Sequence, residues 1–166
     1  MGASDLIMYE EEFQKIKEVI SKLRVDANAN VVFLVDKNGQ QIAATGDIER
    51  LDTTSLASLA AGNVAATDGL AKLIGEREFS VLFHEGEKEN IHISIVGGKV
   101  ILVVIFDERS SLGLVRLRVK RGSDELNKLF HQIMEKTERE RASGKVALES
   151  PFAEITDEDI DALFNE

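Results

Sequence analysis

DTTSLASLAAGNVAATDGLAKLIGE, residues 52–76, is the stretch of sequence that says most about the fold. Small residues recur along it at every fourth position: Ala57, Ala61, Ala65 and Gly69. Residues four apart lie one above another on an α-helix, so the sequence predicts a helix with a smooth ridge that a second backbone could approach closely. Asp52 is a good N-terminal cap for this helix, and Gly75 marks its end.

The other side of this predicted helix is bulky. Its residues at helical spacing are Leu56, Leu59, Asn63, Ala66, Leu70, Leu73 and Ile74. We expect this side to cover the core. Gly62 and Gly69 each lower the stability of a helix by about 1 kcal/mol relative to Ala, so we expect a contact along the ridge that compensates for this loss. Contact with another protein would supply it, and close packing of the helix on a sheet of the same chain would supply it equally well.

The sequence around this helix predicts further helices and strands. A first amphipathic helix is indicated by Tyr9, Phe13, Ile16, Ile20 and Leu23, which step by three and four. Strands are predicted at residues 31–36, 41–45, 79–84, 90–96 and 99–106, with hairpin turns at Asn38-Gly39 and Gly97-Gly98. The last strand reads VILVVIF without alternation, which is typical of the middle of a sheet.

The segment after residue 111 fits two patterns. Val115, Leu117 and Val119 alternate with basic residues as in a half-buried strand. A helical repeat also runs from Leu112 to Ile133, and its length favours a helix. The order helix, hairpin, helix, three strands, helix then predicts an α+β fold, with helices packed on a five-stranded antiparallel sheet.

The C-terminal part of the chain is expected to lie outside this domain. We predict a domain over residues 1–138, a linker over 139–150 and a short amphipathic helix over 151–166. Thr156 can cap that helix, and its apolar residues are Phe152, Ile155, Ile160, Leu163 and Phe164. It is too short to be stable alone, so we expect it to fold on a partner, with docking on its own domain as the alternative.

The amino-acid composition indicates which kinds of molecule the chain can bind. The chain has 166 residues, 43% of them hydrophobic, which suits one core. A net charge of −10 argues against nucleic acid and anionic membrane surfaces as partners. The absence of cysteine excludes disulfides, and no apolar run is long enough for membrane insertion. We therefore expect a cytoplasmic protein that binds other proteins.

Catalytic and ligand-binding motifs are missing from the sequence. Residues 97–100, GGKV, lack the upstream glycine and the hydroxyl of a nucleotide-binding loop. The histidines, His84, His92 and His131, lack metal-site spacing, and we expect them at the surface or at strand edges. We predict no cofactor, no metal and no active site. Arg50, Arg77 and Arg109 are candidates for an arginine supplied to another protein's active site.

Several long segments together resemble the Roadblock/dynein-light-chain family. They are VVFLVDKNGQQIAATG (31–46), the helix at 52–76, FHEGEKENIHISIVGGKVILVVIFD (83–107), SSLGLVRLRVKR (110–121) and SPFAEITDEDIDALF (150–164). The likeness is to the bacterial members that regulate a small Ras-like GTPase. It implies a Roadblock-type α/β/α sandwich and a homodimer in which two sheets meet edge to edge with the middle helices side by side.

The resemblance also implies a function. Such a homodimer would bind the GTP form of a small Ras-like GTPase and stimulate hydrolysis by positioning its switch regions, while the GTPase brings its own arginine. The process would be cell polarity or motility, with the protein concentrated at a cell pole. The surface facing the GTPase would comprise Ala57, Ala61, Ala65 and Gly69 with Lys72 nearby, and the C-terminal helix would make a second contact and promote nucleotide exchange. A scaffold that does not alter turnover is the alternative.

Overall fold

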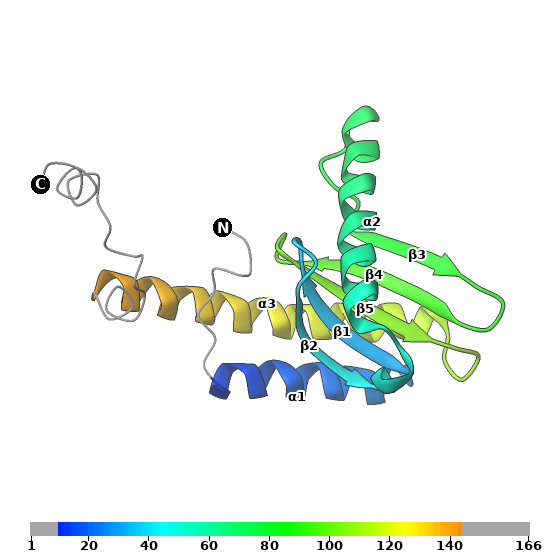
Figure 1. Cartoon of the computed structure of the whole chain (residues 1–166), viewed down its shortest axis with the longest axis horizontal. Helices are drawn as coiled ribbons and strands as arrows, with labels where there is room; N and C mark the ends of the chain where they lie inside the picture. Colours follow the sequence, from blue (N-terminus) through cyan, green and yellow to red (C-terminus); the bar gives the residue numbers. More distant parts are fainter. Residues whose placement is uncertain (1–9, 144–166) are drawn as a thin grey trace, which may run out of the picture.

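The structure, a computed structural model, describes residues 10–143, which contain three α-helices, one short 3-10 helix and five strands (Figure 1). In chain order they are α1 (Glu10–Asp26), β1 (Val31–Asp36), β2 (Gln41–Gly46), the short 3-10 helix η2 (Ile48–Arg50), α2 (Thr53–Leu73), β3 (Val81–Glu85), β4 (Asn90–Val96), β5 (Val100–Phe106) and α3 (Leu112–Ala142). The order predicted from the sequence is confirmed.

The five strands form one antiparallel sheet in the order β2-β1-β5-β4-β3. Strand β5 lies in the middle and all of its residues are buried, as its unbroken apolar run predicted. Strand β1 beside it is also buried throughout. The edges are β2, which is covered by α1, and β3, which carries the exposed Val81. The fold is therefore the predicted α+β sandwich.

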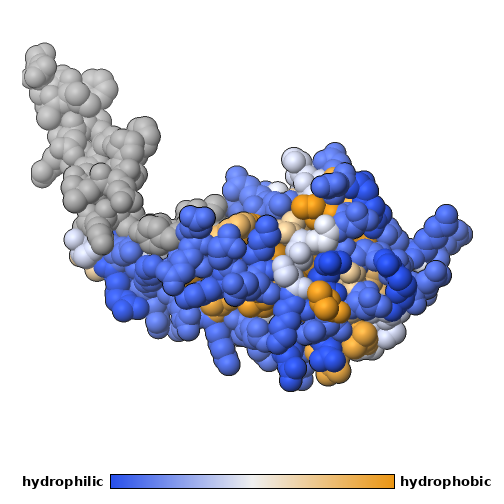
Figure 2. Space-filling view, turned by 90° about the horizontal axis from the view of Figure 1, so that it is seen from below, coloured by the Kyte–Doolittle hydropathy of each residue, from blue (hydrophilic) through white to orange (hydrophobic). Residues whose placement is uncertain are grey.

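Helices α1 and α3 pack together on one face of the sheet (Figure 1). The two helices approach each other closely at Gly122, where a Cβ atom would lie 3.2 Å from Leu23 Cδ2. Near the other end of the pair, the largely buried Glu12 accepts a hydrogen bond from Lys136 Nζ at 2.5 Å. This hydrogen bond holds the pKa of Glu12 below its usual value. The face of the molecule seen from below is mostly hydrophilic, with apolar residues in separate patches (Figure 2).

The ambiguous segment after residue 111 is helical. Ser111 caps α3 by accepting a hydrogen bond from the backbone N–H of Leu114 at 3.2 Å. The three-and-four helical repeat, and not the alternation typical of a strand, is the pattern that the structure follows. The buried residues of the helix are Val115, Val119, Gly122, Leu126, Phe130, Ile133 and Thr137. The helix continues to Ala142, into the range 139–150 that the sequence predicts as a linker. The rest of that linker and the predicted helix at 151–166 lie outside the described residues.

Helix α2 lies on the opposite face of the sheet and follows a different course. Its first half crosses β1, β2 and β5, and its second half continues past the strands (Figure 1). A second apolar cluster fills the space between α2 and the sheet. Only the first half of this helix packs on the sheet; in the second half Ala71 is buried, whereas Ala65, Gly69, Leu70 and Leu73 are exposed.

Candidate partner-binding surface

The start of α2 is fixed by its own cap. Asp52 accepts hydrogen bonds from the backbone N–H of Ser55 at 3.1 Å and from its hydroxyl at 2.6 Å. The hydroxyl bond and then the backbone bond hold the pKa of Asp52 below its usual value, so the carboxylate stays charged at the helix start. At the other end, the left-handed residue Gly75 (φ +83°) follows the C-cap Ile74. The helix bounds expected from the sequence are thus close to those observed.

The buried side of α2 is its small-residue side. Ala57 is 1% exposed and Ala61 is 8% exposed, because both pack on the sheet together with Ala60 and Val64. The apolar side chains beneath them belong mainly to β1 and β5. Two of the residues predicted to face a partner, Ala57 and Ala61, therefore lie inside the chain, where they allow close approach of the helix to the sheet.

The rest of the predicted ridge is open. Ala65, Gly69 and Lys72 are exposed, and a Cβ atom at Gly69 would meet no heavy atom within 4 Å. We call these three residues the small-residue surface. It lies on the half of α2 that extends past the sheet, so the structure keeps it accessible while it buries the first half of the ridge.

The expectation that the bulky side of α2 covers the core is wrong for most of its residues, although Leu56 is partly buried and packs against the core. Leu59 is 71% exposed, Leu73 is 83% exposed, and Leu70 and Ile74 are also exposed; we call these four residues the leucine surface. The physical reason is position. Leu59 lies on the side of α2 opposite Ala57 and Ala61, which pack on the sheet, and Leu70, Leu73 and Ile74 lie on the half of the helix that extends past the sheet.

The leucine surface is the part of the site that sequence reasoning missed. A signal existed, since α2 is apolar on both sides, and a helix that is apolar all round has two surfaces to bury. The exposed Val81 on the edge strand β3 adds further apolar area. Asn63 Nδ2 and His84 Nε2 lie 2.9 Å apart and link α2 to this edge strand.

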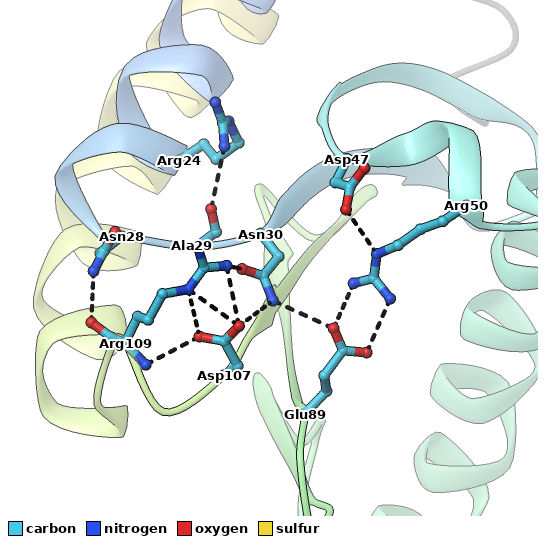
Figure 3. Close-up of polar contacts among 9 residues, drawn as sticks. All are labelled: Arg24, Asn28, Ala29, Asn30, Asp47, Arg50, Glu89, Asp107 and Arg109. Atoms are coloured by element: carbon cyan, nitrogen blue, oxygen red, sulfur yellow. Dashed lines mark hydrogen bonds and ion pairs between the residues drawn. The ribbon is translucent and has the colours of Figure 1, made fainter.

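Two of the candidate arginines belong to a polar network at one corner of the sheet (Figure 3). Arg50 pairs with Glu89 and, at 3.0 Å, with Asp47. Arg109 pairs with Asp107 at 3.0 Å and donates a hydrogen bond to Asn30 Oδ1. These bonds from Arg109, and a further one from Asn30, hold the pKa of Asp107 far below its usual value.

Both network arginines are therefore engaged within the chain, and the network joins η2, the starts of β1 and β4 and the end of β5. Arg77 is exposed and forms no ion pair with any residue in 10–143. The network therefore gives Arg50 and Arg109 a structural role. It does not support the hypothesis that either arginine reaches into the active site of a partner.

The three histidines do not share one environment. His84 and His131 are exposed as expected, but His92 is buried on β4. Its burial, and next to that the nearby charge of Arg116, lower its pKa. Within residues 10–143, no group of three or more His, Asp or Glu side chains could hold a metal ion, and no helix is both long and apolar enough to cross a membrane.

Comparisons with known proteins fit this arrangement. The Roadblock/LC7 domain model matches residues 15–106. Three solved structures are similar at a TM-score of 0.73 each: Myxococcus xanthus MglB at 64% identity, the gliding protein MglB from Thermus thermophilus at 31%, and an MglB with a tetrameric arrangement at 29%. The first covers 77% of this chain and 96% of its own, and the other two cover 80% and 98%. None of the curated proteins compared with the chain matches it.

Proposed function

Since the chain belongs to the Roadblock/LC7 family, we propose that it is a regulator that binds the GTP form of a small Ras-like GTPase, of the MglA type, and stimulates hydrolysis. The observation that carries this proposal is the small-residue surface. Ala65, Gly69 and Lys72 are uncovered on a helix that its own sheet leaves half free. Such a surface lets loops of another protein approach the helix backbone closely.

The proposed mechanism is positioning of the GTPase. An arginine supplied from outside accelerates GTP hydrolysis by about 10³–10⁵. Arg50 and Arg109 of this chain are tied into ion pairs, and Arg77 is the one candidate without an ion pair within residues 10–143; the proposed mechanism is that the GTPase brings its own arginine. The chain would then hold the switch loops and the attacking water in place, and no residue of it would act on the substrate. A relative is described as a gliding protein, and we propose cell polarity or gliding motility as the process for this chain.

A homodimer is the second part of the proposal. The leucine surface and the exposed Val81 on the edge strand β3 form apolar area that a monomer would leave in water. An edge strand also has unpaired backbone groups that can pair with a second copy. Two copies joined through β3 and α2 would bury both features and leave the small-residue surfaces near each other for one GTPase.

GTP turnover tests the proposed function directly. The initial rate of phosphate release by a purified MglA-type GTPase is measured with and without the full chain, and binding is measured in parallel. We expect binding together with faster release. Binding without any change in release would favour the scaffold alternative, and absence of binding to GTP- and GDP-loaded forms alike would contradict both. A chain ending at Gly144 then reports what residues 145–166 add to binding and to nucleotide exchange.

A further inference from the structure

The first half of α3 has a strongly basic outer face. Arg116, Lys120 and Arg121 are exposed, Arg118 is partly exposed, and Lys22 of α1 lines the same shallow groove as Arg118 and Arg121. Leu117 lies among them and is 62% exposed. We call these six residues the basic band. Val115 and Val119 of this stretch are buried, so the residues of the band on α3 occupy the opposite, outer side of the helix.

The cations of the band outnumber the acids beside them: Asp26 and Glu125 line the same groove, and neither forms an ion pair with the band. Within residues 10–143, no ion pair involves Lys22, Arg116, Arg118, Lys120 or Arg121. The Nε atom of Arg118 is buried and has no hydrogen-bond partner in that part of the chain. Three cations elsewhere, Arg50, Arg109 and Lys136, each contact a carboxylate. A positive surface around an exposed leucine is complementary to an acidic and partly apolar ligand.

The chain contains a segment with that chemistry. Residues 143–166 carry one basic residue, Lys145, and seven acids: Glu149, Glu154, Asp157, Glu158, Asp159, Asp161 and Glu166. Their net charge is −6, which is more than half of the −10 of the whole chain. Apolar residues alternate with the acids, among them Ile160, Leu163 and Phe164. An amphipathic segment of this kind matches both the charge of the band and its exposed Leu117.

We propose that residues 151–166 dock on the basic band of the same chain. The length of chain allows it. The eight residues 143–150 reach roughly 27 Å when extended, which equals the rise of α3 from Ala142 back to Asp124, so residue 151 can lie next to the start of the band and the segment can follow the helix past Arg121. The acids would pair with the band's cations while the apolar residues cover Leu117. A segment held there is not available to a partner, so a partner that captures it must first displace it; this last step alone depends on the proposed function.

The absence of cysteine makes the full chain suitable for a distance measurement. Ala162→Cys in the segment and Asp124→Cys on the exposed face of α3 take one spin label each, and the label-to-label distance distribution is measured by pulsed electron paramagnetic resonance. An excess of unlabelled chain removes pairs between copies. We expect a dominant population at short distance that shrinks as salt is raised, because salt screens exposed charges.

Charge-reversal variants test whether docking depends on the cations of the band or only on the net charge of the chain. Arg116→Glu/Lys120→Glu/Arg121→Glu should abolish the short-distance population. The matched control Lys17→Glu/Arg77→Glu/Lys88→Glu, which changes three exposed cations elsewhere, should keep it. Adding Asp157→Lys/Asp159→Lys/Asp161→Lys to the band variant should restore it. Survival in the band variant, equal loss in the control, or loss on dilution with unlabelled chain would each overturn the proposal, whether or not the chain stimulates a GTPase.

Discussion

His92 shows how one side chain makes the stability of the fold depend on pH. In the sheet register it lies opposite Phe83 and Val104, which belong to the core under α1 and α3. Its Nδ1 atom is buried and has no hydrogen-bond partner within residues 10–143. Its pKa is lowered by burial and by Arg116, so the folded chain binds a proton less readily than the unfolded chain.

The first prediction follows from the sign of this shift. The unfolded chain takes up a proton on His92 near its usual pKa of 6.5, whereas the folded chain does so only at lower pH. The free energy of unfolding should therefore fall as the pH is lowered from about 7 to about 5. His92→Leu should flatten this dependence in urea-unfolding measurements. The control His131→Gln, at an exposed residue, should keep it, and an unchanged slope in His92→Leu would contradict the argument.

The second prediction concerns Gly69 in the small-residue surface. Gly69→Arg places a large side chain where nothing lies within 4 Å, so the fold has room for it. Helix propensity should even stabilise α2 by up to about 1 kcal/mol. Stimulation of GTP hydrolysis should nevertheless be lost, because the arginine blocks close approach of the GTPase; Ala65→Arg should behave in the same way.

The matched control for this variant is Gly113→Arg. Gly113 also lies in a helix and also has open space around its Cβ position, but it belongs to α3. Phosphate release should stay at the wild-type level in this control. A stably folded Gly69→Arg/Ala65→Arg chain with full stimulation would remove the small-residue surface from the proposed function.

At the scale of elements, the α1–α3 pair depends on Gly122. A Cβ atom there would already lie 3.2 Å from Leu23 Cδ2, and a larger side chain would force the two helices apart. Gly122→Leu should lower the free energy of unfolding by about 1–3 kcal/mol, the usual cost of overpacking. Urea unfolding measures the change, with Gly113→Leu as the exposed counterpart. Equal stability of the two variants would contradict close packing at Gly122.

At the scale of the whole molecule, the exposed apolar area predicts association. Leu70→Asp/Leu73→Asp introduces charges into the leucine surface and should convert the proposed dimer into a monomer. Sedimentation velocity across a concentration series measures this directly. Val25→Asp changes an apolar residue that is 68% exposed on α1, and it should leave the dimer intact. A wild-type chain that stays monomeric at all concentrations would contradict the dimer.

Local sequence patterns determined the elements of this protein and their order. The three-and-four spacing of Ile16, Ile20 and Leu23 gave a helix, and the unbroken apolar run of β5 gave a strand at the centre of the sheet. These patterns suffice because hydrogen bonding along a helix and the alternation of side chains along a strand depend on neighbours in sequence. The family was recognisable for the same reason, since it is carried by these elements in this order.

Only the tertiary structure decided which sides of those elements face the core. Ala57 and Ala61 are buried while Leu70 and Leu73 are exposed, although both sides of α2 are apolar. His92 is buried, although histidine as a residue type favours neither the core nor the surface. Burial depends on where the opposing element lies: β1 and β5 lie under the first half of α2, and the second half extends past them. That placement involves segments far apart in sequence, so no pattern within one helix contains it.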